Sequence, residues 1–404
     1  MNQVNFDEII PREGTNSINY EGYEGWLIPA GETLPYEPDE IIRMWVADMD
    51  FAVPQAVIDA LHARIDQRIF GYTGLFDPGY LDAFLNWCQE KYHWTVPREQ
   101  IVTSPGIVPA LFDLVDLMTL PGEKVLILTP SYAPFQKASQ HHNREVICSP
   151  LQNVEGEFFM DWEDLRAKAR DPRTSLCIFC NPHNPTGRVW QEEELKEFAR
   201  LMREENMWVI SDEIHCDLLR TGLRHIPLAN VMGEYTRLVT CMAPSKTFNL
   251  AGFMISNLVI PDPQLREAWQ KRSILGENPL SLTAAQSAWQ HGQEWLEQLK
   301  AYLDDNFEFL KGFLDRHLPE TRYRIPQATY LAWVDFSAYL SPDIESPQLF
   351  FAKEAGVILE DGSMFVGNGE GHVRLNLACP RSVLAEGLER IRQALLPVAV
   401  PMKD

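Results

Sequence analysis

The sequence lacks the features that would place the protein in an oxidising compartment, in a membrane or on nucleic acid. Its seven cysteines are an odd number scattered along 404 residues, so they predict no disulfide framework and favour a cytoplasmic protein. The first residues lack the basic and apolar regions of a signal peptide, and the apolar runs are shorter than a membrane span. A formal charge of −22 argues against nucleic acid and anionic membranes as partners, because their phosphates would repel the protein.

Internal repeats and low-complexity segments are missing as well. Hydrophobic residues make up 45% of the chain and charged residues 23%, which is typical of a globular protein with a large core. A length of 404 residues allows two or three domains.

Short apolar runs alternate with amphipathic runs through the middle of the chain. The apolar runs predict strands at residues 101–103, 125–128, 176–180, 208–210 and 238–240. The amphipathic runs predict helices at residues 54–69, 80–92, 107–118 and 192–205. This alternation indicates an α/β fold with a mainly parallel central sheet covered by helices on both faces.

The pattern changes near residue 285. A long helical pattern with a break covers residues 282–318, and strands at 330–335 and 373–377 precede a final helix at 381–396. We therefore predict three parts: an N-terminal arm (1–43) that belongs to the small domain, a large domain (44–285) and a smaller α+β C-terminal domain (286–404).

Polar motifs follow the predicted strands, each at the point where the strand ends. In a parallel sheet these ends meet at one edge, where ligands bind. The chain therefore predicts that all these motifs lie on one rim.

Lys246 follows the strand at 238–240 and lies between small or apolar neighbours, Ser245 and Thr247 among them. An isolated lysine is usually a solvated surface charge. Apolar surroundings, however, lower the pKa of a lysine and make its amine reactive. The hypothesis is that Lys246 forms a Schiff base with pyridoxal phosphate, which also requires a phosphate cradle and a partner for the ring nitrogen.

Asp212 and the turn at residues 104–108 offer those two groups, and each has a structural alternative. Asp212 follows the strand at 208–210 and either pairs with a protonated ring nitrogen or caps a helix. Gly106 lets the backbone approach an anion where the N–H groups of Ile107 and Val108 begin a helix, although such turns are often only structural. We assign no role to Glu213.

Three further residues each have a functional and a structural interpretation. Asn184 lies in the string Asn-Pro-His-Asn-Pro-Thr-Gly at 181–187, which is either a rigid turn or a source of an amide for the cofactor ring oxygen. Tyr132 either stacks on a cofactor ring or belongs to the core. Arg374 either grips a substrate carboxylate or forms a structural salt bridge.

Cys177 and Cys180 form a C-x-x-C inside a predicted strand, without a second pair. We interpret them as core residues, and we predict no metal site.

With these residues in place, the chain from about Met44 to Arg381 resembles fold-type I pyridoxal-phosphate enzymes of the class I/II aminotransferase superfamily. Within it, residues 44–51, 211–215, 243–249 and 374–381 resemble the MalY/PatB group, whose members are cystathionine β-lyases and cysteine-S-conjugate β-lyases.

The resemblance implies a role for each motif. Lys246 would anchor pyridoxal phosphate and act in catalysis, and Arg374 would bind the substrate α-carboxylate. Tyr72 would also act in catalysis, because it would reach the phosphate of the neighbouring subunit's cofactor, which implies a homodimer with shared sites. The remaining residues implied to bind the cofactor are Gly106, Ile107, Val108, Tyr132, Asn184, Asp212, His215 and Ser245.

Three departures from these family patterns stand out, two from the aminotransferases and one from the lyase group. His215 stands three residues after Asp212, where those enzymes usually have a tyrosine and the lyase group has histidine. Met254 stands where they usually carry a phosphate-binding arginine. Residues 19–21, Asn-Tyr-Glu, replace the Lys-Trp-Asp that is common near the start of the lyase group.

The resemblance implies a carbon–sulfur β-lyase. It would eliminate a thiol such as homocysteine from cystathionine or a related cysteine conjugate and leave pyruvate and ammonia, with the Lys246 amine removing the Cα proton. A pyridoxal-phosphate aminotransferase shares these catalytic residues and is the first alternative. A cofactor-binding regulatory protein with little turnover is the second.

Overall fold

The computed structural model describes residues 3–272 and 276–396. Its largest sheet has seven strands in the order β2-β11-β10-β9-β8-β3-β5. The strands are β2 (Ile101–Ser104), β3 (Lys124–Thr129), β5 (Glu145–Pro150), β8 (Thr174–Cys180), β9 (Trp208–Asp212), β10 (Leu238–Met242) and β11 (Ser256–Val259). β11 runs antiparallel to both neighbours, and the other pairings are parallel. The predicted α/β fold with a mainly parallel sheet is confirmed.

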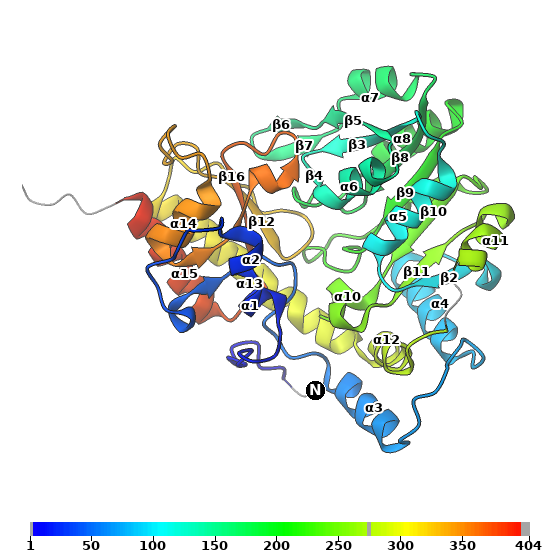
Figure 1. Cartoon of the computed structure of the whole chain (residues 1–404), viewed down its shortest axis with the longest axis horizontal. Coiled ribbons are helices and arrows are strands. Elements are labelled where there is room, and N and C mark those ends of the chain that lie inside the picture. Colours follow the sequence, from blue (N-terminus) through cyan, green and yellow to red (C-terminus); the bar gives the residue numbers. More distant parts are fainter. Residues whose placement is uncertain (1–2, 273–275, 397–404) are drawn as a thin grey trace, which may run out of the picture.

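Helices cover both faces of this sheet (Figure 1). Successive strand residues point to opposite faces, so Val125 and Ile127 of β3 pack on one side and Leu126 and Leu128 on the other. The first face carries α5 (Ile107–Met118), α6 (Ala133–His141) and α11 (Pro263–Arg272). The second carries α7 (Trp162–Ala169), α8 (Glu192–Glu204) and α9 (Leu228–Met232). Because both faces are buried, central strands such as β3 and β8 are largely apolar runs.

Another helical layer lies beyond the β2 side of the sheet. It contains α3 (Gln55–Asp66), α4 (Gly79–Tyr92) and α12 (Pro279–His291), and α12 packs against the other two. Aromatic rings fill this contact, with Trp289 5.5 Å from Tyr80 and 5.2 Å from Phe84 between ring centroids.

The C-terminal part is built on an antiparallel sheet in the order β12-β16-β14. Its elements are α13 (Gln293–His317), β12 (Leu331–Asp335), α14 (Pro347–Ala355), β13 (Val357–Ile358), β14 (Glu360–Asp361), β15 (Phe365–Val366), β16 (His372–Asn376) and α15 (Arg381–Leu395). The N-terminal helices α1 (Ile18–Glu21) and α2 (Tyr23–Leu27) lie beside it (Figure 1), and β1 (Ile42–Arg43) pairs with β13. The short elements that remain are β4 (Ser131–Tyr132), β6 (Gln152–Val154), β7 (Glu157–Phe159), α10 (Pro244–Thr247) and the 3-10 turns Pro38–Glu40, Arg98–Gln100, Ala251–Phe253 and Gly362–Met364.

The sequence missed two strands of the large sheet. β5 is a partly exposed edge strand, and β11 contains the buried polar residues Ser256 and Asn257, so neither forms a continuous apolar run. The predicted break in the long helix lies at Gly292, between α12 and α13. The boundary predicted between residues 285 and 286 falls inside α12, and the division into domains stays a prediction.

The apolar face of α3 is only partly covered. Val57 is fully buried, whereas Ile65 is 47% exposed and Ile69, beyond the end of the helix, is 75% exposed. In the described part of the chain, no helix combines the length and the apolar character needed to cross a membrane.

The central strands should tolerate truncation poorly. Leu126 is fully buried between β3 and the helices of the second face, so Leu126→Ala should lower the free energy of unfolding by about 2–5 kcal/mol through lost burial and a cavity. Leu120→Ala is the control, because Leu120 is 68% exposed. Urea unfolding followed by circular dichroism measures both, and equal midpoints for the two variants would contradict the packing described.

Candidate active site

The carboxyl ends of five strands bring predicted site residues to one edge of the large sheet. Asp212 ends β9, and four others follow the ends of strands. These are Lys246 after β10, Asn184 after β8, Tyr132 after β3 and Gly106 after β2. β2 has the same direction as β10 because both run antiparallel to β11. The placement of these residues on one rim agrees with the prediction.

Lys246 is buried in this rim. It lies on α10, and its Nζ donates a hydrogen bond of 2.6 Å to the carbonyl oxygen of Ala47. Burial lowers the pKa of the amine to about 8; Asp48, Asp212 and Glu360 oppose this shift, and Arg374 adds to it. The amine therefore loses its proton more than two pH units below an ordinary lysine.

Asp212 is 5% exposed, and its carboxylate accepts a hydrogen bond of 3.2 Å from the backbone N–H of Ile214. Burial raises the pKa of this carboxyl to about 7, although the Ile214 N–H and Lys246 act in the opposite direction. A carboxylate that is buried with so few donors is suited to a cationic ligand.

His215 lies on the same turn and is 3% exposed. Burial lowers the pKa of its imidazole to about 3, and Lys246 and Arg374 lower it further, so the ring is neutral at physiological pH. Its Nδ1 has no hydrogen-bond partner in the described part of the structure. The ring of Tyr330 lies edge-on to it at 6.4 Å.

Glu213 is not a surface residue. It is fully buried, and its Oε2 lies 2.6 Å from Nε2 of His225. Its Oε1 accepts hydrogen bonds from the Ser211 hydroxyl at 2.8 Å and the Leu228 N–H at 3.0 Å. Glu213 therefore fixes the backbone next to Asp212, a role that the sequence did not indicate.

Arg374 joins the C-terminal part to the rim. It is 3% exposed on β16, and its Nη1 donates to Oδ1 of Asn184 at 3.3 Å. Its Nη2 donates to the carbonyl of Trp45 at 3.1 Å and pairs with Glu360. Its Nε is buried without a partner among the described residues. Residues 190 positions apart thus meet at one point.

Gly106 precedes α5 with a φ of 152°, a conformation that favours glycine. None of the described side chains caps this helix, so the N–H groups of its first turn, including those of Ile107 and Val108, are suited to an anion. Ser245 lies on α10 beside Lys246, and its carbonyl accepts a hydrogen bond of 3.0 Å from the Leu250 N–H.

Tyr132 is held by a ladder to the C-terminal part. It lies on β4, directly opposite Phe365 of β15. Burial raises the pKa of its hydroxyl to about 12, so the phenol stays protonated.

Residues 45–51, called the connecting segment below, form no strand, and side chains satisfy most of their carbonyl groups. In the sequence, this stretch was notable only for its resemblance to the MalY/PatB group. The sequence indicated no role for Asn249, Asn376 or Tyr330, whose side chains donate hydrogen bonds to its carbonyl groups. In chain order, the bonds are Arg374 to Trp45 O (3.1 Å), Asn376 to Val46 O (2.7 Å), Lys246 and Tyr330 to Ala47 O (2.6 and 2.7 Å), Asn376 to Asp48 O (2.5 Å), Asn249 to Met49 O (2.9 Å) and Asn249 to Phe51 O (3.1 Å).

Two positions singled out in the sequence lie on the surface of the chain. The Tyr72 side chain is fully exposed, in the loop before α4, and Met254 is 61% exposed. The structure therefore does not bring Tyr72 to Lys246 within one chain.

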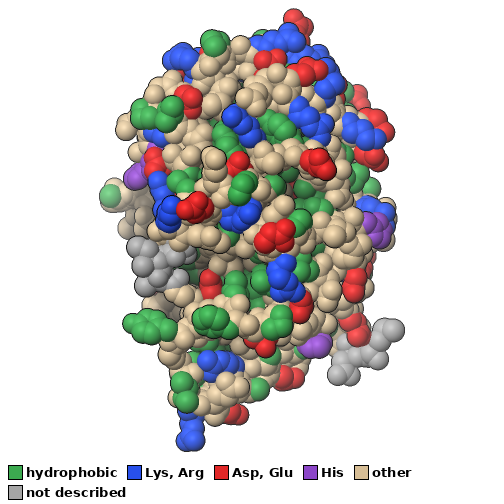
Figure 2. Space-filling view, turned by 90° about the vertical axis from the view of Figure 1, so that its right-hand side faces the viewer, with side chains coloured by type: hydrophobic (Ala, Val, Ile, Leu, Met, Phe, Trp, Pro, Cys, Tyr) green, Lys and Arg blue, Asp and Glu red, His purple; other side chains and the backbone are tan. Residues whose placement is uncertain are grey.

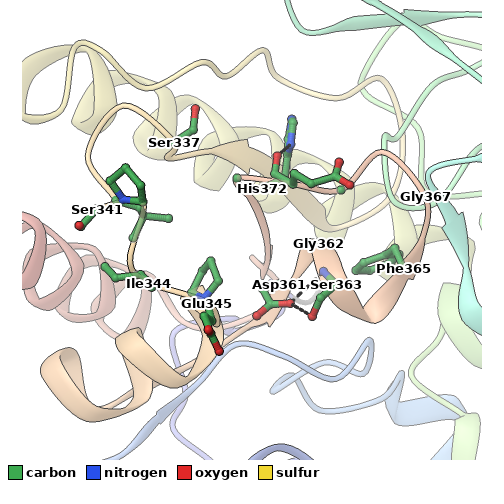
Figure 3. Close-up of a pocket in the computed structure, with 16 residues that line it drawn as sticks. Ser337, Ser341, Ile344, Glu345, Asp361, Gly362, Ser363, Phe365, Gly367 and His372 are labelled. Carbon is green, nitrogen blue, oxygen red and sulfur yellow. Dashed lines mark hydrogen bonds between the residues drawn. The ribbon is translucent and has the colours of Figure 1, made fainter.

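The C-terminal part contains a separate cavity of about 440 Å³, called the outer cavity below (Figure 3). Its lining includes Ser341, Glu345, Asp361, Phe365 and His372. Phe365 separates this cavity from the site, because its ring also lies over the Arg374 guanidinium at 5.1 Å. The cavity therefore adjoins the rim but does not contain Lys246.

Cys177 and Cys180 are buried core residues, as the sequence predicted. Within residues 3–272 and 276–396, no three or more His, Cys, Asp or Glu side chains are grouped to hold a metal ion.

Comparison with known proteins gives consistent matches along the chain. Residues 39–391 match the family described as Aminotransferase class I and II. The chain is 40% identical to cystathionine β-lyase PatB of Bacillus subtilis, over 97% of this chain and 100% of that protein. It is 30% identical to protein MalY of Escherichia coli, over 97% and 99%.

A solved structure is similar over the same extent. The PLP-bound C-S lyase from Staphylococcus hominis, in complex with the inhibitor L-cycloserine, superposes with a TM-score of 0.94 at 46% identity, covering 97% of this chain and 98% of that one. The predicted fold type and the resemblance to the MalY/PatB group are thus confirmed.

The lowered pKa of Lys246 can be measured directly. In cofactor-free protein, the rate of reductive methylation of Lys246 should rise with pH to a midpoint near 8, because only the unprotonated amine reacts. Asp48→Asn should move the midpoint lower, since Asp48 is the strongest of the groups that raise this pKa. Mass spectrometry of the peptides gives the rate, with exposed Lys271 as the reference. A midpoint of 10 or above would contradict the buried setting.

Proposed function

Because the chain belongs to the aminotransferase class I and II family, we propose that it is a pyridoxal-phosphate-dependent carbon–sulfur β-lyase. Its substrates are cystathionine or related cysteine S-conjugates, which it converts to a thiol, pyruvate and ammonia. One observation carries the proposal: full-length similarity to a cystathionine β-lyase and a C-S lyase coincides with a rim that contains Lys246, Asp212 and Arg374.

The residues of the rim fit pyridoxal phosphate. The cofactor presents an aldehyde, a ring nitrogen that can be protonated, a ring oxygen and a phosphate. Lys246 offers an amine of lowered pKa for the aldehyde, and Asp212 a buried carboxylate for the ring nitrogen. Asn184, with Oδ1 engaged by Arg374, offers its Nδ2 as donor to the ring oxygen. The uncapped start of α5 suits the phosphate.

Other residues complete this assignment. Tyr132 would stack on the ring, and Ser245 with the amides of Gly106, Ile107 and Val108 would hold the phosphate. His215 has a buried Nδ1 that lacks a partner within the described residues, so a bound ligand would relieve the loss of hydrogen bonding there. When bound, pyridoxal phosphate withdraws electrons from the bonds at the substrate Cα.

The chain's own residues would then orient the substrate and move one proton. Arg374 binds the α-carboxylate through its guanidinium, whose position is fixed by Asn184 and Trp45. The Lys246 amine accepts the Cα proton, which its pKa of about 8 permits near neutral pH. The Ala47 carbonyl holds the resulting ammonium. The C–S bond at Cβ would break with its electron pair leaving on sulfur as a thiolate, and water would then release pyruvate and ammonia.

An aminotransferase would use the same lysine, aspartate and arginine, so the site alone does not select the lyase. The selection rests on the lyase names of the full-length relatives. His215 supports it, because a neutral imidazole stands where the aminotransferases carry a tyrosine.

The active unit is a homodimer in this proposal, with Tyr72 completing the site of the partner. Large apolar side chains exposed around α3 support it, since such patches mark interaction surfaces. Figure 2 faces the side with α11 and α3 and shows hydrophobic side chains on its lower part. The residues are Ile65 (47% exposed), Ile69 (75%), Phe70 (51%), Tyr72 (103%) and Phe76 (95%).

The free state of all seven cysteines supports a cytoplasmic location.

Pyruvate release without a keto acid is the direct test of the lyase. A panel of cystathionine, cystine and S-alkyl cysteines should yield pyruvate, and Lys246→Ala should lower kcat by about three orders of magnitude because the proton acceptor is lost. Lys271→Ala, on the exposed face of α11, serves as control. Strict dependence on a keto acid would establish the aminotransferase. Cofactor absorbance that is lost in Lys246→Ala, with negligible turnover on every thioether, would establish a regulatory protein.

Shared sites can be tested by mixing two inactive variants. Lys246→Ala and Tyr72→Ala dimers, unfolded and refolded together in equal amounts, should recover about a quarter of the wild-type activity, because half the dimers are mixed and each has one intact site. Mixing either variant with itself is the control. If no activity returns although the mixed dimer forms, Tyr72 does not act in the partner's site.

A further inference from the structure

The guanidinium that we assign to the substrate carboxylate already faces a carboxylate of the chain itself. Glu360 of β14 lies directly opposite Arg374 of β16 in the antiparallel sheet, and the two side chains form an ion pair. Arg374 is 3% exposed, and the Glu360 side chain is 17% exposed. The pair is therefore shielded from water. An ion pair in such a buried setting is stronger than one on the surface.

The rest of the guanidinium is also engaged. Its Nη1 donates to Asn184 and its Nη2 to Trp45 as well as Glu360. The ring of Phe365 lies over it at 5.1 Å. Within the described residues, Nε is the nitrogen without a partner. A substrate carboxylate can therefore form the paired bonds typical of arginine only if Glu360 moves or gives up part of its contact.

Glu360 is fixed from the far side of its strand. Its neighbour Asp361 points the other way, as successive strand residues do, and lies at the edge of the outer cavity next to Ser363 (Figure 3). The Asp361 oxygens accept from the Ser346 hydroxyl, the Gln348 N–H and both donors of Ser363. These bonds hold β14 in register and keep Glu360 directed at the site.

Glu360 also acts on the reactive amine. Its charge raises the pKa of Lys246. Burial raises the pKa of Glu360 itself, and the charges of Arg374 and Lys246 oppose that shift. Asp48 and Asp212 add negative charge around the same amine. The wall of the site therefore carries several carboxylates close to its cations.

We propose that Glu360 is a specificity-determining residue that competes with the substrate carboxylate for Arg374 and disfavours substrates whose second carboxylate has no ammonium group beside it. The distal carboxylate of cystathionine has its own ammonium group, which offsets its charge. The inference rests on the proposed function, in which Arg374 binds the α-carboxylate. A monocarboxylate must displace Glu360 from Arg374. A dicarboxylate must do so and then face the displaced Glu360, which repels it. Aspartate, glutamate and their keto acids, which are dicarboxylates, are thereby disfavoured.

Ligands that cannot react test the competition by Glu360 independently of the lyase reaction. Isothermal titration of the holoenzyme would use 3-(methylthio)propanoate, its neutral alcohol 3-(methylthio)propan-1-ol and the dicarboxylate 3-(carboxymethylthio)propanoate. None of them has an amino group, so binding is measured without turnover. Glu360→Gln should tighten the monocarboxylate about tenfold and the dicarboxylate more, while the alcohol is unchanged.

A matched control tests whether the charge acts locally. Glu370→Gln removes the same charge at an exposed position in the lining of the outer cavity, and should leave all three affinities unchanged. In the substrate assay, Glu360→Gln should lower KM, because competition for Arg374 in the ground state is removed.

Several outcomes would overturn the inference. Unchanged or weaker carboxylate binding in Glu360→Gln would mean that Glu360 only holds Arg374 in place. Equal tightening in Glu370→Gln would mean that net charge alone acts. If Glu360→Gln does not fold, Glu360→Asp replaces it as the test. Because the shorter side chain reaches Arg374 less well, this variant should tighten binding of the monocarboxylate, and of the dicarboxylate more, while the alcohol is unchanged. Absence of pyruvate from every thioether, with the affinity shifts intact, would reject the lyase and leave the competition by Glu360 standing.

Discussion

The site depends on the connecting segment, a stretch of backbone that has no strand to satisfy it. Buried carbonyl groups need donors, and here the donors are side chains from the sheet region and from the C-terminal part. Asn376 and Asn249 each bind two of these carbonyls. The Ala47 carbonyl thereby takes a fixed position against Lys246. Parts of the chain that are distant in sequence become one site through this segment.

Desolvation sets the charges around that segment. Burial lowers the pKa of Lys246 and His215 and raises that of Asp212, in each case toward the neutral form. Such opposed shifts in one place are typical of functional sites. Arg12 from the N-terminal arm pairs with Asp48 and Asp50 at 2.6 and 2.9 Å, so the arm also fixes acidic groups near the reactive amine.

The sequence predicted the sheet and the rim because both produce local signals. Apolar runs mark β3, β8, β9 and β10, and a polar residue that follows such a run must lie at the edge of a parallel sheet. It missed β11, which has polar residues on a buried strand. It also gave no role to Glu360, Asn249 or Tyr330. Asn249 and Tyr330 act through contacts 200 and 283 residues away, and Glu360 through a cross-strand ion pair with Arg374, and no periodicity in the sequence records such contacts.

The exposed residues Ile65 and Ile69 illustrate the same limit at the surface. Their spacing indicates a buried helix face, yet among the described residues of one chain Ile65 stays 47% exposed and Ile69 75% exposed. A single sequence does not distinguish a face covered by its own fold from one covered by a second copy. The free energy gained by burying such side chains is the same in both cases.

The short ladder between β4 and β15 has a mechanical consequence. It joins Tyr132, on the sheet side, to Phe365, which belongs to the C-terminal part and covers Arg374. A rotation of the C-terminal part as a rigid body must either break this ladder or carry Tyr132 with it. Motion of the C-terminal part, which carries Arg374, is thereby transmitted to Tyr132 on the sheet side.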